Sequence, residues 1–383
     1  MKKTPDSRRV RNVCDAMEAI APTWLAADWD NVGLLVGSGD WPANRLLLTI
    51  DLTPDVAMEA IRKKTDVVIA YHPPIFRAIK SMRPNLVDQE GIAAEMLSRR
   101  IAVYSPHTAL DSAEEGTNVT LARLAGVADA RPFSAAVSPS GACKIVTFVP
   151  ANAADTLAEA MFAAGAGRIG DYEKCSYRLE GRGTFFGADS TNPAVGRKGR
   201  LESVAEIRLE VIVPNRRLGD VTSALRRAHP YEEPAFDIYP LAGEPLSTLG
   251  QGRVGLFEKP TRLRDLAQRL ASMVCAIAPA MVGRPSAAIR RAFVCVGAAG
   301  SLPFETDAGP CGAGDVIITG EIRHHDALRY ERCGAAAIAL GHSTSERPVL
   351  KPLGAMLRKR LPGVQIDISR KDRDPLQAVE FSR

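Results

Sequence analysis

The chain has 383 residues, and its 46% hydrophobic and 24% charged residues are ordinary for a globular protein with buried cores. That length favours two or three domains rather than one. The net charge of +5 permits an anionic small substrate, but it gives no support by itself to a nucleic-acid-binding protein.

Neither the start of the chain nor its apolar segments predict export or membrane insertion. The first residues, MKKTPDSRRV, are charged and lack the apolar region of a secretory signal. No segment approaches the roughly 18 uninterrupted apolar residues that a membrane span needs. The seven cysteines never form a CxxC pair, which fits reduced thiols rather than disulfides or a thiolate zinc site. We therefore expect a cytoplasmic protein that does not bind a membrane.

The first part of the chain alternates strand and helix patterns. Strands are predicted at 45–52, 66–71 and 101–105, and helices at 54–64 and 89–100. Thr53 is an expected N-cap, followed by Pro54 at the first helical position. The strands are apolar throughout, which is typical of a sheet covered by helices on both faces.

The middle of the chain has a different pattern. Strands are predicted at 144–149, 207–213 and 235–241, and helices at 153–164 and 216–228. Two β-α-β halves of this kind indicate a small ferredoxin-like α+β domain. Its expected edges are the Pro/Ser/Gly-rich segments SPSG (138–141) and LAGEPLSTLGQG (241–252).

The last part repeats the α/β pattern of the first. Strands are predicted at 292–297, 315–319, 335–340 and 364–368, and helices at 262–278, 323–332 and 349–360. The predicted fold is therefore α/β, with two related α/β lobes forming an outer core (1–137 and 251–383). An inserted ferredoxin-like α+β domain (138–250) splits this core.

Histidines and carboxylates follow the predicted strands of the outer core. His72 follows the second strand, His107 and Asp111 follow the third, and His342 and Glu346 follow the strand at 335–340. In open α/β sheets, ligands bind at the carboxyl ends of the strands. Neutral imidazole nitrogen and anionic oxygen suit Zn, Mn or Fe without any cysteine. This pattern predicts a divalent-metal site.

Local sequence supports two of these positions. Pro73 and Pro74 would hold the backbone of His72 rigidly, because proline restricts both its own φ and the residue before it. His342 and Glu346 are four residues apart at the start of a helix, so their side chains would point the same way.

Structural roles remain open for each residue taken alone. Glu346 could close a capping box with Ser343 as the N-cap. Asp111 could cap a loop through an Asx turn, and His72 or His107 could form ordinary hydrogen bonds. His324 and His325 could be a solvated helix start. His229, with Glu232 and Glu233, could bind metal, but a structural turn is the preferred interpretation.

Other motifs are absent or weak. No GxGxxG segment follows a strand, and neither a Walker loop nor a GxSxG nucleophile elbow is present. The basic segment VGRKGRLE (195–202) is interpreted as an exposed loop rather than a phosphate site. Basic residues are not interleaved with aromatic ones, so a nucleic-acid platform has little support.

Several segments together resemble the Nif-three-like proteins, which are also labelled type 2 GTP cyclohydrolase I homologues. The similar segments are DWDNVGLLVGS (28–38), YHPPIF (71–76), SPHTALDSAEEGTN (105–118), ITGEIRHHDAL (318–328) and GHSTSERPVL (341–350). Within the middle domain, HPYEEPAFDIYPL (229–241) resembles the PII/CutA-like insert of some bacterial members. The resemblance covers nearly the whole chain.

This resemblance implies a toroidal homohexamer whose dinuclear metal centre faces the inner cavity. The implied ligands of the two ions per chain are His72, Asp111, His342 and Glu346. Many members have two adjacent histidines before the proline, whereas here the first is Tyr71. A tyrosinate could ligate iron, or Tyr71 could position a metal-bound water.

We therefore expect a divalent-metal-binding protein that acts as a metal-dependent hydrolase on a small molecule, for which the family label suggests a nucleotide such as GTP. His107 is the expected proton carrier, and Tyr71 is the second expected catalytic residue. The alternative is a non-enzymatic hexameric metal-binding or regulatory protein whose insert senses a ligand. A DNA-binding ring is the weakest of the three interpretations.

Overall fold

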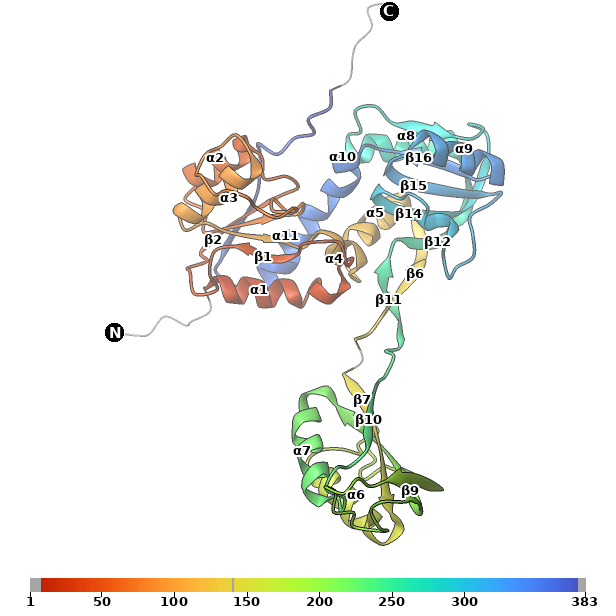
Figure 1. Ribbon diagram of the computed structural model, residues 1–383. Helices are drawn as coiled ribbons and strands as arrows, with labels where there is room; N and C mark the ends of the chain where they lie inside the picture. The colour runs from red at the N-terminus through yellow and green to blue at the C-terminus, as the bar shows by residue number, and fades with distance from the viewer. Residues whose placement is uncertain (1–7, 140, 378–383) are drawn as a thin grey trace, which may run out of the picture. The chain divides into compact units, whose positions relative to one another are not determined.

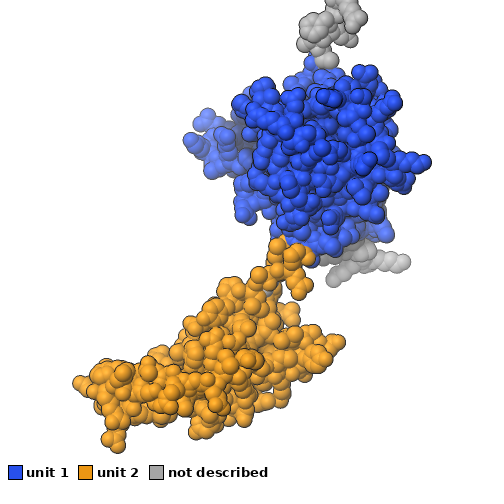
Figure 2. Space-filling model, turned by 90° about the vertical axis from the view of Figure 1, so that its right-hand side faces the viewer, with its two compact units in different colours: residues 1–136, 246–383 blue, residues 137–245 orange. Residues whose placement is uncertain are grey.

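The computed structural model describes residues 8–139 and 141–377. The chain forms two compact units, residues 1–136 with 246–383 (unit 1) and residues 137–245 (unit 2), which are coloured separately in Figure 2. It passes from one unit to the other within β6 (Ser134–Val137) and β11 (Pro245–Gln251), which pair in a two-stranded sheet. No helix within the described ranges is both long and apolar enough to cross a membrane.

Unit 1 contains a five-stranded sheet in the order β1-β4-β3-β2-β17. Two of its strands, β1 and β2, are labelled in Figure 1. Its strands are β1 (Gly33–Val36), β2 (Arg45–Thr49), β3 (Val67–Ala70), β4 (Ala102–Ser105) and β17 (Gln365–Ile368). All neighbours are parallel except β1, which is antiparallel to β4 at one edge. β3 is fully buried, as its apolar sequence predicts for a sheet with two covered faces.

Helices cover both faces of this sheet. α2 (Pro54–Arg62) and α3 (Gln89–Ser98) pack on the face that carries Leu47 and Val68. The helices on the opposite face are α1 (Val10–Glu18), α4 (His107–Ser112) and α11 (Leu350–Arg360). As predicted, the Thr53 hydroxyl caps α2 by accepting from the N–H of Val56.

A second, six-stranded sheet of unit 1 has the order β13-β16-β15-β14-β12-β5. Its strands are β5 (Val127–Arg131), β12 (Arg253–Arg262), β13 (Ala280–Val282), β14 (Ala288–Ala298), β15 (Asp315–Glu321) and β16 (Ala336–Ala339). The central β14, β15 and β16 are parallel. α5 (Thr117–Ala125) and α8 (Leu263–Val274) pack on one face, while Tyr330 of α9 (His324–Cys333) packs on the other.

Each sheet takes one edge strand from the other half of the chain. β17 lies near the carboxyl end of the chain but pairs with β2, and β5 precedes the insert but pairs with β12. The strand predicted at 364–368 is confirmed as β17, but the sequence pattern gave no partner for it. Local periodicity predicts a strand but does not select its partner, which long-range packing decides.

Unit 2 is a β-α-β-β-α-β segment. In chain order its elements are β7 (Ala142–Pro150), α6 (Ala154–Ala163), β8 (Tyr177–Phe186), β9 (Leu201–Pro214), α7 (Leu218–Ala228) and β10 (Phe236–Pro240). The strands form an antiparallel sheet in the order β10-β7-β9-β8. Its core contains Leu157, Leu209 and Val221, so α6 and α7 pack on one face of the sheet.

Sequence analysis missed β8 and predicted β9 too short. β8 is exposed at most positions and includes two glycines, so it has no apolar alternation to identify it. It is defined instead by ten consecutive residue pairs with β9. The structure starts β9 at Leu201, at the end of the segment interpreted as a basic loop.

Candidate metal centre

The first imidazole lies at the carboxyl edge of the five-stranded sheet. Beyond the end of β3, the His72 N–H still donates to the Ile50 carbonyl at 3.0 Å, which extends the parallel ladder by one bond. Its Nδ1 lies 2.9 Å from Asp51 Oδ1, just after β2. Its Nε2 lies 3.3 Å from Glu346 Oε2. A carboxylate on one ring nitrogen that leaves the other toward a site is the usual support of a metal-binding histidine.

The second imidazole repeats this arrangement on the other sheet. α10 (His342–Glu346) follows β16, and the i,i+4 spacing brings His342 Nε2 within 3.3 Å of Glu346 Oε1. His342 Nδ1 lies 3.2 Å from Oε1 of Glu321, the last residue of the parallel strand β15. In both sheets, therefore, a carboxylate at the end of the neighbouring parallel strand orients the imidazole.

Glu346 joins the two imidazoles. Ligand atoms of His72, His342 and Glu346 all lie within 4.8 Å of one another. Glu346 is only 2% exposed, and its Oε2 accepts no hydrogen bond even though an imidazole nitrogen lies nearby. A buried carboxylate oxygen without a partner is costly. A cation between the three side chains would remove that cost.

Gly297, near the end of β14, leaves the space that this cluster occupies. Its φ is +61°, and a Cβ there would lie 2.7 Å from Glu346 Oε1 and 3.3 Å from His342 Nε2. The backbone at this position therefore requires glycine twice, once for its conformation and once for the approach of the ligand atoms.

The electrostatics of the cluster favour positive charge. Burial opposes protonation of His72, but its hydrogen bond with Asp51 and the nearby negative charge of Glu346 outweigh it and raise the pKa of His72 to about 10. Burial likewise opposes ionisation of Asp51, yet its bond to His72 holds the pKa of that carboxyl below its usual value. A divalent cation would take the place of the proton, since metal binding requires a neutral imidazole. The donor set and its charge therefore fit Zn, Mn or Fe.

Asp111 lies outside this group of three. Its Oδ1 accepts a 2.6 Å hydrogen bond from the Tyr71 hydroxyl, and Tyr71 is 2% exposed. Burial raises the pKa of Asp111 to about 6, against the bond from Tyr71 and the nearby His107. Its role as a metal ligand stays a prediction.

His107 stands beside His72 but makes a different pair. Its ring centroid is 5.3 Å from that of His72 and 5.5 Å from that of Tyr71. Its Nδ1 lies 2.8 Å from Oδ1 of the buried carboxylate of Asp30, whose Oδ2 accepts from the Thr108 N–H at 3.1 Å. Burial would raise the pKa of Asp30, but these bonds lower it, so the carboxylate is charged beside the imidazole.

Sequence reasoning missed Asp30, Asp51 and Glu321. Asp30 lies within the DWDNVGLLVGS segment, and Glu321 lies within ITGEIRHHDAL, but neither was assigned a role. Asp51 and Glu321 could have been found by asking which carboxylates end the strands next to those that carry the histidines.

The capping box suggested for STSE does not form. Gly341 is the N-cap residue of α10, with no side-chain cap, because the helix begins two residues earlier than that motif requires. The Ser343 hydroxyl instead donates to Asp374 Oδ2 at 3.1 Å. Glu346 is thus free of a capping role and faces the two imidazoles.

The remaining histidines have structural or solvent-exposed positions. His324 and His325 are exposed at the start of α9 and do not belong to the candidate metal-binding group of His72, His342 and Glu346. His229 Nε2 lies 3.0 Å from the Phe148 carbonyl, and its Nδ1 accepts from the Tyr231 N–H at 3.1 Å. Both ring nitrogens are therefore used, which confirms the structural turn.

Comparison with known proteins identifies relatives over almost the full chain. A Mycobacterium tuberculosis protein named GTP cyclohydrolase 1 type 2 homolog is 34% identical over 358 residues, 92% of each chain. A Halalkalibacterium halodurans protein of the same name is 32% identical over 375 residues, 96% of this chain and 98% of the relative.

Solved structures are also similar to this chain over almost its full length. The Bacillus cereus protein related to NIF3 has a TM-score of 0.62 at 29% identity, covering 97% of this chain and all of that one. A Staphylococcus aureus protein at 24% identity shares the fold, with a TM-score of 0.72 over 98% of this chain and 100% of its own. The model of the Duf34/NIF3 (NGG1p interacting factor 3) family matches residues 8–375. This chain therefore belongs to the Duf34/NIF3 family, as the five sequence motifs predicted.

Proposed function

We propose that the chain is a metal-dependent hydrolase that binds a divalent cation through His72, His342 and Glu346. The buried Glu346 carboxylate carries this proposal, because it lies 3.3 Å from an imidazole nitrogen on each side and one oxygen has no hydrogen bond. Three protein ligands suit a catalytic site, which keeps a position open for water or substrate. A bound divalent ion would supply Lewis acidity and lower the pKa of a coordinated water.

His107 is the proton carrier in this proposal. Asp30 holds Nδ1, so Nε2 is the nitrogen left to exchange a proton with a reacting group. Its ring lies against that of the ligand His72, within reach of the same small molecule. Tyr71 acts through Asp111, since its hydroxyl donates to that carboxylate and keeps it oriented.

An exposed aromatic pair supports a substrate with a planar ring, such as a nucleotide. Trp29 is 64% exposed and Phe76 is 52% exposed, unusual for such large apolar side chains. The Trp29 ring centroid is 6.0 Å from those of Phe76 and His107, so the pair adjoins the proton carrier. The Asn31 amide ties the two loops by donating to the Ile75 carbonyl at 2.5 Å. The name of the relatives, GTP cyclohydrolase 1 type 2 homolog, makes GTP the first nucleotide to test.

The second ion of the predicted dinuclear centre would need Asp111 as a ligand, with Glu346 bridging. Tyr71 stands where a second histidine was expected, and its hydroxyl already donates to Asp111. This bond occupies Oδ1 of Asp111, so a second ion would bind through Oδ2 or compete with the tyrosine for Oδ1. Two ions per chain is a prediction that metal analysis decides.

The test is metal content by mass spectrometry on protein purified without a histidine tag, for the wild type and His342→Ala. His324→Ala is the matched control, because it removes an exposed histidine outside the cluster. We expect metal in the wild type and the control and its loss in His342→Ala. No metal after reconstitution with Zn, Mn and Fe would refute the proposal. One ion per chain would reject the dinuclear centre, and two would support it.

Turnover tests the hydrolase separately from metal binding. Loss of nucleotide hydrolysis in His107→Ala, with metal retained, would support the proton-carrier role, and unchanged turnover would remove it. Trp29→Ala should raise KM more than it lowers kcat if the ring only positions substrate. A metal-loaded protein without an exchangeable water would favour the non-enzymatic alternative.

The proposal also includes assembly into a homohexamer and a PII/CutA-like insert. A homohexamer predicts a solution mass about six times the 41.1 kDa of the chain, which light scattering measures. The β-α-β-β-α-β order of unit 2 supports a PII/CutA-like ferredoxin-like insert between two α/β lobes, at predicted boundaries 138 and 250. Cytoplasmic location likewise stays a prediction.

A further inference from the structure

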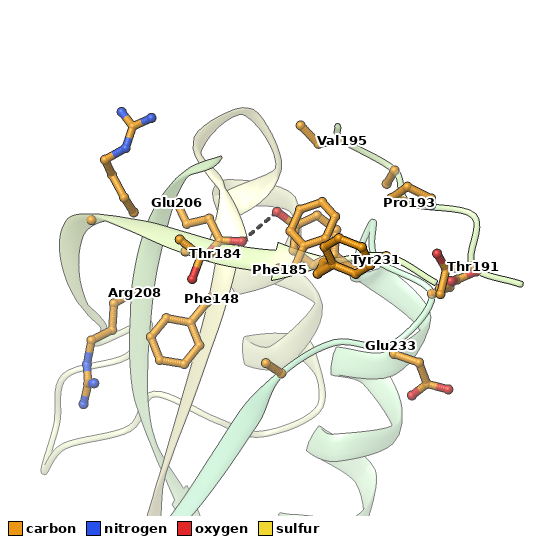
Figure 3. Close-up of a pocket in the computed structure, with 18 of the residues that line it drawn as sticks. Phe148, Thr184, Phe185, Thr191, Pro193, Val195, Glu206, Arg208, Tyr231 and Glu233 are labelled. Carbon is orange, nitrogen blue, oxygen red and sulfur yellow. Dashed lines mark hydrogen bonds between the residues drawn. The ribbon is translucent and has the colours of Figure 1, made fainter. Parts of the chain in front are cut away.

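Unit 2 contains a pocket of about 720 Å³ that includes none of the metal-cluster residues (Figure 3). It lies on the sheet face opposite α6 and α7. Leu209 of β9 points into the helix-covered core, so its neighbour Arg208 and then Glu206 face the other side. The segments around Val195 and Glu233 complete the wall.

Two glycines of β8 produce the hollow. Gly181 pairs with Glu206 across the strands, and a Cβ added there would meet nothing within 4 Å, so the space above it is open. A Cβ on Gly183 would lie 2.1 Å from Glu206 Oε2. Glycine at 183 therefore makes room for the Glu206 carboxylate above the sheet.

Aromatic rings line the pocket around this carboxylate. Figure 3 shows the rings of Phe148, Phe185 and Tyr231 around Glu206. The Tyr231 hydroxyl donates to Glu206 Oε1 at 2.7 Å, drawn as a dashed line, and fixes its orientation. Within the described residues, no protein donor reaches Oε2. The floor of the pocket thus presents one free carboxylate oxygen among apolar rings.

The charge of the lining is negative once its internal partners are counted. Glu206, Glu232 and Glu233 form no ion pair with Lys or Arg in the described part of the chain. Of the basic lining residues, Arg208 is paired with Glu210 at 2.8 Å. Arg182, which donates to the Ser203 hydroxyl at 3.2 Å, keeps its positive charge, but this single charge does not offset the carboxylates of Glu206, Glu232 and Glu233. The pocket therefore favours a cation and opposes a phosphate or carboxylate.

We propose that this pocket binds a small organic cation with an aromatic or apolar body. Its ammonium group would bond to Glu206 Oε2, and its body would contact Phe148 and Phe185. The rings add attraction for the cation through their faces, and the apolar body gains by leaving water. Such a site would let unit 2 respond to an amine independently of the proposed hydrolase.

The experiment is calorimetric titration of the full chain with three ligands of similar shape: 2-phenylethylamine, the neutral 2-phenylethanol and the anionic 3-phenylpropanoate. We expect the amine to bind about tenfold or more tighter than the alcohol, and the carboxylate to bind weakest. Added salt should weaken binding of the amine only. Equal binding of amine and alcohol, preference for the carboxylate, or no amine binding at millimolar concentration would overturn the proposal.

Variants locate the site. Glu206→Gln should weaken binding of the amine about tenfold, because the charge of the carboxylate is lost. It should leave binding of the alcohol unchanged, because the amide oxygen still accepts the hydrogen bond from Tyr231. Gly181→Val should weaken binding of both the amine and the alcohol, because the valine side chain would fill the open space of the pocket. The matched control is Glu159→Gln on α6, a helix that packs on the other face, and it should change neither. Unaltered amine binding in both pocket variants would reject the site, whatever the metal content of the protein.

Discussion

Substitution of Gly297 by alanine tests the metal cluster through its geometry rather than by removing a ligand. The new Cβ would lie 2.7 Å from Glu346 Oε1, so the carboxylate must move about 0.7 Å to reach the 3.4 Å of ordinary contact. A site held to about 0.5 Å cannot absorb that movement. We expect metal affinity to fall about 10–100-fold, similar to the loss of a supporting residue. Stability should fall by about 1–2 kcal/mol, because alanine is strained at φ +61°.

Gly300→Ala is the matched control for the strain. Gly300 has φ +53° and nothing within 4 Å of its added Cβ, so it has the same backbone cost without contact to the cluster. Affinity is measured by competition with a chromogenic zinc chelator, and stability by calorimetry of the metal-free proteins. Equal zinc affinity of the two variants, whether both keep it or both lose it, would refute the reasoning.

Three further substitutions test the supports of the fold and the cluster. Asp51→Asn removes the carboxylate that orients His72 and should lower metal affinity about 10–100-fold, measured by the same competition. Burial would raise the pKa of Glu59, but bonds from the Ser369 hydroxyl and other donors lower it to about 2. The Glu59 carboxylate therefore stabilises the folded state above pH 4.5, and this stabilisation is lost as the pH falls toward 2. Glu59→Gln should lower the free energy of unfolding, measured with denaturant, by about 2–3 kcal/mol at pH 7 and by progressively less below pH 4.5. Arg253, 1% exposed, donates to four backbone carbonyls, so Arg253→Met should cost about 3–4 kcal/mol and a smaller loss would mean that water replaces those bonds.

Local features of the sequence predicted the three residues that meet in the candidate metal site, together with Asp111, which lies outside that group. Strand-end positions selected His72, and the i,i+4 spacing selected His342 with Glu346. These signals need only a few neighbouring residues, because helix periodicity and strand termination are local properties. The apolar runs of β2 and β3 likewise predicted a sheet buried on both faces. The family motifs predicted the membership that the comparisons confirmed.

Only the tertiary structure decided which of these residues meet. It brought His72 to within 3.3 Å of Glu346, 274 positions further along the chain, and left Asp111 bonded to Tyr71. It also paired β17 with β2 and formed β8 from a polar, glycine-containing segment. Contacts of this kind depend on how whole sheets and helices pack. No short window of sequence contains both partners, so the pattern names the candidates and packing determines the site.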